Sequence, residues 1–291
     1  MTLETSSATE TTSAGEITLE TTADEIAIVT IRRPARRNAL SAQTLGELHA
    51  VFDEIASSRT LRVVVVRGEG VAFCSGADMK SGVDDLKQAG DTPTGALAAS
   101  VEGAIPRAFA MQELMAGLFE KIHRLRQPVI AAIHGPAHGG GFALALACDI
   151  RFATPQASFG AVFIQRGVSA CDMGTSYHLP RLVGAARSAE LLLTGRVFDA
   201  AEAERIGLVF EIVEESLLQE RALAKAREIA AHSPLAVWMT KETMWQTVDS
   251  PSLRHALDLE NRTQILCTAT GDIAEAFAAF RERRKPTWKP L

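Results

Sequence analysis

Three consecutive glycines, Gly139, Gly140 and Gly141, stand between a strand pattern and a helix pattern, where backbone groups could do chemistry. The apolar run at 128–133 predicts a buried strand, and the small and apolar residues at 142–148 predict a helix buried on all sides. Glycine lets the backbone turn sharply and approach a ligand, and a buried helix N-terminus presents unpaired N–H groups at the positive end of the helix dipole. Such a site would stabilise an oxyanion, although a turn that only packs a helix against a strand would give the same pattern.

A second strand pattern leads into another group of small residues. Val63 to Val66 form a β-branched run, a turn follows at 67–70, and the chain continues with Ala72-Phe73-Cys74-Ser75-Gly76-Ala77-Asp78. A strand, small residues, Gly-Ala-Asp and a later strand that leads into Gly-Gly-Gly together resemble the enoyl-CoA hydratase/isomerase (crotonase) family. The resemblance runs from about Glu16 to the C-terminus, and further segments stand in the family's order: Arg33-Pro34, Arg37-Asn38-Ala39-Leu40, Cys148-Asp149-Ile150, Leu193-Thr194-Gly195 and Ala203-Glu204-Arg205-Ile206-Gly207-Leu208-Val209.

The resemblance implies a reaction on an acyl-CoA thioester. A proton leaves the carbon beside the thioester carbonyl only if the enolate oxygen is stabilised, and two convergent backbone N–H groups do this without becoming charged. By resemblance, the donors are the N–H groups of Ala77 and Gly140. In a well-studied protease, losing one such donor costs roughly two to three powers of ten in rate.

The acids of the reaction are where this sequence departs from the family. Enoyl-CoA hydratases add water with two glutamates, which together activate the water and supply the proton. Alignment on the glycine run puts the first at Ala143, and the same gap-free alignment through Phe159-Gly160 puts the second at Phe163. Neither side chain can transfer a proton, so hydration by two glutamates is not expected.

A third position of the family can carry an acid. Some Δ3-Δ2-enoyl-CoA isomerases have one glutamate a few residues before an apolar residue and a proline. Counting back from Leu179-Pro180, that position is Asp172, and dienoyl-CoA isomerases carry an aspartate in a similar Asp-x-Gly-Thr setting. One carboxylate suffices to move a proton from C2 to C4, since the same group removes and returns it. Asp172 could equally be only an N-cap for a helix from Met173. Cys171 has no histidine in a recognisable dyad context and is interpreted as a small core residue.

The CoA part of the substrate needs a basic, partly apolar rim. By resemblance, Arg37 lies where the family's N-terminal loop contacts CoA, and Lys80 follows the Ala77-Asp78 turn. Phe280 and Arg283 match C-terminal positions that reach the CoA of a neighbouring subunit. A basic end of the C-terminal helix is also expected from helix-dipole complementarity alone. Coenzyme A belongs to the substrate, so no separate cofactor and no metal are predicted.

The elements that position these groups follow an α/β alternation. Ser41 is a plausible N-cap for a helix at 42–56, which has an apolar stripe of Leu45, Leu48, Phe52 and Ile55. Asp199 is a plausible N-cap for a short helix closed by Gly207. A loop or short helices that move are expected at 81–106, a segment rich in small and polar residues of a kind that often acts as a lid, before an amphipathic helix at 107–126. From Glu215 the pattern is helical, with breaks at Ser233-Pro234 and Ser250-Pro251.

The resemblance sharpens this alternation to an α/β, crotonase-like spiral of ββα turns with a C-terminal helical trimerisation subdomain. The expected organisation is a disordered tail at 1–15, the spiral core with the acyl-CoA site at 16–213 and the helical subdomain at 214–291. The assembly implied is a homotrimer, or a hexamer of two trimers.

Composition excludes several other classes of protein. The 291 residues are 47% apolar with a net charge of −5, which argues against a general nucleic-acid binder. No apolar run is long enough to span a membrane. The four cysteines have no CxxC spacing, so neither a disulfide framework nor a zinc site is expected, and a reducing compartment fits. The first residues lack the features of a secretory or mitochondrial leader, which makes the cytoplasm the default location.

Two classes of function remain open. The first is an enzyme on acyl-CoA thioesters, with Δ3-Δ2 (or dienoyl) isomerisation favoured by the single acid Asp172 and a hydratase of fatty-acid β-oxidation with a non-standard acid/base as the alternative. The second is a non-catalytic acyl-CoA binder that kept the oxyanion loops and lost the acids. The direction in which the Asp172 carboxylate faces distinguishes the two classes.

Overall fold

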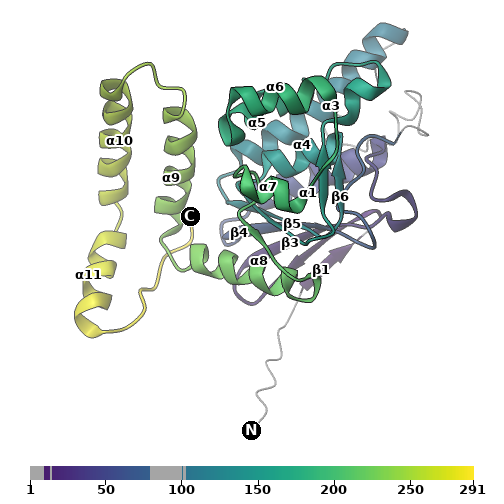
Figure 1. Ribbon diagram of the computed structural model, residues 1–291. Coiled ribbons are helices and arrows are strands. Elements are labelled where there is room, and N and C mark those ends of the chain that lie inside the picture. The colour runs from purple at the N-terminus through teal and green to yellow at the C-terminus, as the bar shows by residue number, and fades with distance from the viewer. Residues whose placement is uncertain (1–9, 14, 79–99, 101–102) are drawn as a thin grey trace.

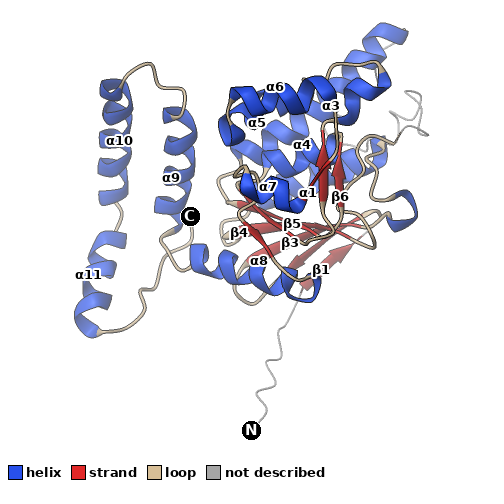
Figure 2. Cartoon of the chain, viewed as in Figure 1, coloured by secondary structure: helices blue, strands red, loops and turns tan. Residues whose placement is uncertain are grey.

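A seven-stranded sheet forms the centre of the molecule (Figure 2). The structure, a computed structural model, describes residues 10–13, 15–78, 100 and 103–291. The strands, in spatial order, are β1 (Glu10–Ser13), β2 (Ile17–Thr21), β3 (Ile26–Ile31), β4 (Val63–Gly68), β5 (Val129–Ile133), β7 (Ile150–Ala153) and β10 (Glu211–Ile212). The β1–β2 and β2–β3 pairs are antiparallel and the later pairs are parallel.

A second, three-stranded sheet shows how the chain winds. It contains β6 (Pro136–His138), β8 (Ser158–Gly160) and β9 (Phe198–Asp199). The segment β5–β6 places one strand in each sheet before the helix α4 (Gly140–Ala147), and β7–β8 repeats this before the next helices. This is the spiral of ββα turns that the sequence predicts.

Helices cover both faces of the large sheet (Figure 1). On one face, α1 (Ala42–Ser57), α3 (Ala104–Arg124) and α4 share a core with alternate residues of the strands. On the other face, α8 (Glu215–Ala230) packs its buried residues against β3, β4 and β5. The expected cap of α1 is confirmed, because the Ser41 hydroxyl accepts the N–H of Thr44 at 3.1 Å, and the predicted stripe of α1 is buried.

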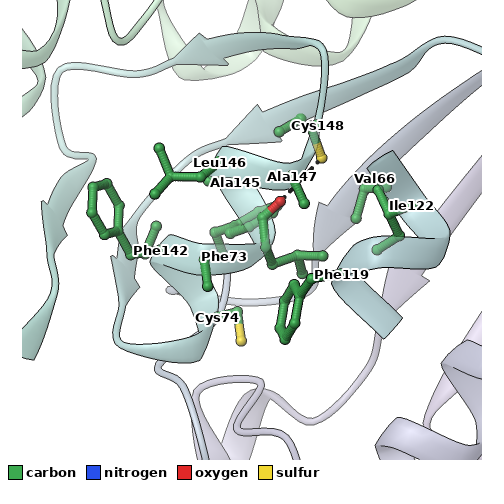
Figure 3. Close-up of a cluster of buried hydrophobic side chains, with 14 of the residues drawn as sticks. Val66, Phe73, Cys74, Phe119, Ile122, Phe142, Ala145, Leu146, Ala147 and Cys148 are labelled. Carbon is green, nitrogen blue, oxygen red and sulfur yellow. Dashed lines mark hydrogen bonds between the residues drawn. The ribbon is translucent and has the colours of Figure 1, made fainter. Parts of the chain in front are cut away.

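Helix α4 lies in the middle of the core, and all eight of its residues are buried. Figure 3 shows Phe142 on one side of this helix and Phe119 and Ile122 of α3 on the other. Its C-terminal carbonyls are satisfied by the buried Arg151, whose guanidinium donates to the carbonyl of Ala145 at 3.2 Å. Packing on all sides therefore fixes the direction of α4 and the position of its N-terminus.

The remaining helices follow the expected breaks. They are η1 (Pro34–Arg36), η3 (Val162–Arg166), α5 (Thr175–Val183), α6 (Ala185–Thr194), α7 (Ala200–Arg205), α9 (Pro234–Thr247), α10 (Leu253–Thr268) and α11 (Asp272–Glu282). Asp199 caps α7 as predicted, accepting the N–H of Glu202 at 2.8 Å. Figure 1 shows α9, α10 and α11 standing apart from the sheet. In the described part of the chain, no helix is both long and apolar enough to cross a bilayer.

Three observations bear on the predicted organisation. The tail expected to be disordered is ordered at Glu10–Ser13, which pair with β2. Helix α8, which lies inside the expected helical subdomain at 214–291, carries Leu218, Ala222 and Ala226 into the core beneath the sheet. Most of the expected lid at 81–106 lies outside the described residues, and Pro106, expected as a breaker, lies inside the first turn of α3.

Candidate active site

Two loops that carry the predicted N–H donors pack directly against each other. Gly76 has a φ of +94°, and a Cβ there would lie 2.8 Å from the carbonyl oxygen of His138 and 3.0 Å from the nitrogen of Gly140. A Cβ on Gly141 would lie only 1.9 Å from the carbonyl oxygen of Cys74. Glycine is therefore required at both positions, one for its conformation and close approach and the other for space alone.

The N–H groups of Ala77 and Gly140 are both available to a ligand. Neither donates a hydrogen bond to any other residue that the structure describes. The loop around Ala77 is fixed on both sides, because Leu40 donates to the carbonyl of Gly76 at 2.8 Å and accepts from the N–H of Asp78 at 2.9 Å. Gly140 is the first residue of α4, so its N–H has no partner within the helix. The positive end of a buried helix dipole adds to the attraction for a negative oxygen.

A buried set of polar contacts holds the first of these loops. Arg33 pairs with Asp78 at 3.0 Å and with Glu16 at 2.7 Å, and all three side chains are largely shielded from solvent. Asn38 is fully buried with a φ of +56°, and its amide donates to the carbonyls of Glu69 and Ala72. The sequence segments containing Arg33 and Asn38 match the family's order, and the structure adds their role in fixing the loop.

Asp172 lies on a short segment that reaches the glycine loop. Its backbone forms a turn with Thr175, whose hydroxyl accepts the Asp172 N–H at 3.1 Å and whose N–H donates to the Asp172 carbonyl at 2.9 Å. The next residue, Met173, is buried, with its sulfur 3.4 Å from the position of a Cβ on Gly140. This contact brings the half-buried Asp172 next to the residues at the start of α4.

The Asp172 carboxylate does not cap α5. The helix starts at Thr175, and its N-cap residue is Gly174. No side chain accepts a capping hydrogen bond at this end of the helix. Oδ1 of Asp172 instead accepts the N–H of Met173 at 2.7 Å and the side-chain amide of Gln112 from α3. The alternative that Asp172 serves only as an N-cap is therefore wrong. Cys171, expected in the core, is exposed.

Comparison with known proteins decides the family. The sequence model described as "Enoyl-CoA hydratase/isomerase" matches residues 21–290. The chain belongs to the enoyl-CoA hydratase/isomerase family. It is 38% identical over 267 residues to the protein of Mycobacterium tuberculosis named probable enoyl-CoA hydratase EchA12, covering 91% of this chain and 89% of that one.

Solved structures of the family share the fold. A crystal structure of a probable enoyl-CoA hydratase/isomerase from Mycobacterium abscessus aligns with a TM-score of 0.83 and 36% identity, covering 94% of this chain and 99% of the other. A crystal structure of an enoyl-CoA hydratase from Bacillus anthracis aligns with a TM-score of 0.80 and 32% identity, covering 97% and 98% of the two chains. These likenesses confirm the predicted crotonase-like fold.

The two positions where hydratases of the family carry glutamates hold apolar side chains here. Ala143 is fully buried in α4, one turn after Gly139, whose carbonyl accepts its N–H at 3.0 Å. The Phe163 ring lies 3.6 Å from the position of a Cβ on Gly139. Phe163 therefore borders the glycine loop with an apolar surface. The sulfur of Cys74, beneath the same loop, is no substitute acid, because burial raises the pKa of this thiol to about 12.

The residues expected to contact CoA fall into two groups. Arg37 is exposed, and its carbonyl accepts the N–H of Ser75 at 3.0 Å. The backbone of Arg37 therefore lies next to the loop that carries Ala77. Phe280 is 83% exposed on α11, and Arg283 ends that helix. Figure 1 shows α11 below α10 at the outer edge of the molecule, on the far side of α9 from the sheet, so within one chain these two residues lie far from α4. Lys80 lies outside the described residues.

Buried histidines lie behind the Asp172 segment. The rings of His178 in α5 and His123 in α3 are 4.8 Å apart, and a Cβ on Gly174 would lie 3.2 Å from His178. Burial is the main reason that the pKa of His178 is lowered to about 3 and that the pKa of His123 is lowered too. Both rings therefore stay neutral near pH 7. A cavity of about 1020 Å³ adjoins His123 between α3 and α9, and its lining contains none of the predicted catalytic residues.

Proposed function

We propose that this protein is an enzyme on acyl-CoA thioesters that isomerises a 3-enoyl-CoA to a 2-enoyl-CoA, with Asp172 as its single proton carrier. The observation that carries the proposal is an aspartate at the isomerase-type position, whose neighbour Met173 contacts Gly140, combined with apolar residues at 143 and 163. The N–H groups of Ala77 and Gly140 would bind the thioester oxygen.

The proposed steps conserve the proton. A carboxylate oxygen of Asp172 takes a proton from C2, and the C–H electron pair moves into a dienolate whose negative charge rests on the thioester oxygen. The two backbone N–H groups stabilise that oxygen as charge develops. Asp172 then gives the same proton to C4 while the double bond moves to C2–C3, which restores the carboxylate. No water is consumed, so one acid is sufficient.

Hydration of a 2-enoyl-CoA is the second candidate, because several relatives bear the name enoyl-CoA hydratase. It would require Asp172 to work with a further group that activates water. A non-catalytic acyl-CoA binder would show neither activity. These alternatives differ in products, so one screen separates them.

The test is turnover of 3-enoyl-CoA and 2-enoyl-CoA substrates in D2O, followed by mass spectrometry of the products. The wild type should isomerise the 3-enoyl-CoA, and deuterium should enter at C2 or C4 only in the fraction of events in which the proton on Asp172 exchanges with solvent before it is returned. Asp172→Asn keeps the shape and can still accept the N–H of Met173, but it cannot carry a proton. Its turnover should fall by at least about two powers of ten, with acyl-CoA binding retained.

Asp199→Asn is the matched control, because it makes the same exchange at an exposed cap of α7 and should leave turnover unchanged. Undiminished isomerisation by Asp172→Asn would reject Asp172 as the proton carrier. Hydration without isomerisation by the wild type would replace the proposed reaction with the second candidate. A wild type that neither isomerises, hydrates nor exchanges protons with any substrate would support the non-catalytic acyl-CoA binder.

We also infer that the chain works as a trimer, or as a hexamer of two trimers, with CoA partly bound by a neighbouring subunit. The supporting observation is the row of exposed apolar side chains on the helices that stand apart from the sheet, namely Leu253, Ile265, Leu266, Phe277 and Phe280. Apolar surface of this kind is usually covered by a partner. Sedimentation showing a monomer at micromolar concentration, with CoA binding intact, would contradict this inference.

A further inference from the structure

We propose that Gln112 of α3 is a positioning residue that fixes the Asp172 carboxylate and leaves one of its two oxygens for proton transfer. The inference rests on the proposed role of Asp172. It adds a residue from a distant part of the chain, 60 positions before Asp172, to the part of the site that contains Asp172.

The two carboxylate oxygens of Asp172 have different surroundings. Oδ1 accepts two hydrogen bonds, from the Gln112 amide and from the N–H of Met173. Oδ2 accepts none from the residues that the structure describes. Hydrogen bonds from neutral donors stabilise charge on the oxygen that they contact. Oδ2 is therefore the oxygen that takes the proton from C2 and returns it to C4.

The two donors to Oδ1 play different parts. The Met173 N–H belongs to the residue next to Asp172, so it moves with the Asp172 segment. Gln112 belongs to another element and ties the carboxylate to the core. Its amide can donate a hydrogen bond, and it does not act as an acid or a base near neutral pH. It therefore holds the carboxylate without competing for the proton.

The backbone of Gln112 is held in place because helix α3 is packed against the core. Leu114, Leu118 and Ile122 of this helix are fully buried against the core. The imidazole of His49 in α1 contacts the carbonyl of Leu114 at 2.8 Å, which attaches α3 to its neighbour close to Gln112. A side chain on a helix held in this way can position a partner more accurately than one on a loop.

The consequence concerns the return of the proton. When Oδ2 carries the proton from C2, it must present it to C4 before the proton exchanges with solvent. A carboxylate that is free to rotate about its Cβ–Cγ bond presents the proton to C4 less often and to water more often. Loss of the Gln112 amide should therefore slow isomerisation and also increase exchange per isomerisation event.

Gln112→Met tests this directly, because methionine has a similar length and no donor. In D2O with 3-enoyl-CoA, or the substrate that the wild type turns over best, kcat should fall about tenfold, which corresponds to loss of one hydrogen bond to a charged group. KM should stay within about twofold, and the ratio of deuterium incorporation to isomerisation should rise. A residue that only fills space would not change that ratio.

Two more variants complete the experiment. Gln246→Met removes an amide that donates to a carboxylate on the exposed face of α9, at 3.2 Å from Glu242, and should match the wild type. Gln112→Glu keeps the shape but places a second carboxylate against Asp172, so its activity should decrease with rising pH relative to the wild type. It gives an independent readout if Gln112→Met folds poorly.

The outcomes distinguish this inference from the proposed function. If Asp172→Asn abolishes exchange while both Gln112 variants keep the wild-type kcat and deuterium ratio, the role of Gln112 is rejected and the proposed function stands. If Asp172→Asn exchanges protons like the wild type, the proposed function fails first and this inference fails with it. A lower kcat and a higher deuterium ratio in Gln112→Met, with Gln246→Met unchanged, support the proposal.

Discussion

The two halves of the candidate site use different kinds of group: backbone N–H groups in one half and a side-chain carboxylate in the other. In one half, the N–H groups of Ala77 and Gly140 belong to the backbone, and main-chain hydrogen bonds with glycine contacts hold them in place. In the other half, the proposed proton carrier is one side chain, Asp172, held at Oδ1 by a neighbouring N–H and by an amide from α3.

This difference explains what each half can tell about function. Backbone donors survive many side-chain changes, so the first half is common to a fold that supports several reactions on thioesters. The acid can be moved or lost by a single substitution, as at Ala143 and Phe163. The reaction of this chain therefore depends on the side-chain half, while its family follows from the backbone half.

The largest expected effect comes from breaking the backbone half alone. Gly140→Pro removes one N–H at the first position of α4, where proline suits a helix, and its ring occupies the place of the hydrogen. Activity should fall by about two to three powers of ten or more. Steady-state kinetics measure this, with circular dichroism as the control for folding. Near wild-type turnover by a folded variant would remove Gly140 from the site.

An intermediate effect should follow from loosening the support of the same half. Arg33→Met breaks the shielded pairs with Asp78 and Glu16, and should lower the free energy of unfolding by about 2–3 kcal/mol, because partners are left unpaired in a partly buried place. The neighbouring Arg32→Met breaks only an exposed pair with Glu69 and should cost less than about 1 kcal/mol. Urea denaturation compares them. Equal costs for the two variants would show that the shielded pairs do not hold the loop.

A further effect depends on pH and concerns the stability of the side-chain half. The folded protein binds a proton at His178 only near pH 3, whereas the unfolded chain does so near pH 6.5, so unfolding takes up a proton between these values. Stability should therefore decrease as pH falls from about 6.5 towards 3, with His178 contributing up to about 1.4 kcal/mol per pH unit. Because His178 packs against Gly174, this loss acts on the segment that carries Asp172.

His178→Phe keeps a ring in the core and removes the titrating group. Denaturation curves between pH 6.5 and 4 should show a shallower loss of stability for the variant than for the wild type. Parallel pH dependences would show that His178 binds its proton equally well in both states.

The sequence predicted the parts of the fold that depend on local patterns. The strand at 128–133 and the stripe of Leu45, Leu48, Phe52 and Ile55 were correct because an apolar run, hydrophobic periodicity and an N-cap are local signals. The strand at 10–13 was missed because its polar residues gain order only by pairing with β2. The role of α8 was missed because its buried face consists of Leu218 and two alanines, a weak signal for packing.

The candidate site was predictable to a similar degree. The glycine contacts follow from motifs, since only glycine fits where one backbone touches another, as at Gly76 and Gly141. The Arg33–Asp78 pair and the Gln112–Asp172 hydrogen bond join residues far apart in the chain. No spacing rule in one sequence brings such side chains together, because tertiary packing alone determines those distances.

The most direct test of the central claim measures the two halves separately on one bound ligand. A saturated acyl-CoA carrying 13C at the thioester carbonyl reports its polarisation through the carbonyl stretching frequency in difference infrared spectra. The account predicts that binding to the wild type lowers this frequency, that Asp172→Asn lowers it equally while losing deuterium exchange at C2, and that Gly140→Pro loses most of the shift. A shift that disappears in Asp172→Asn, or persists in Gly140→Pro, would contradict the division of the site into a backbone half and a side-chain half.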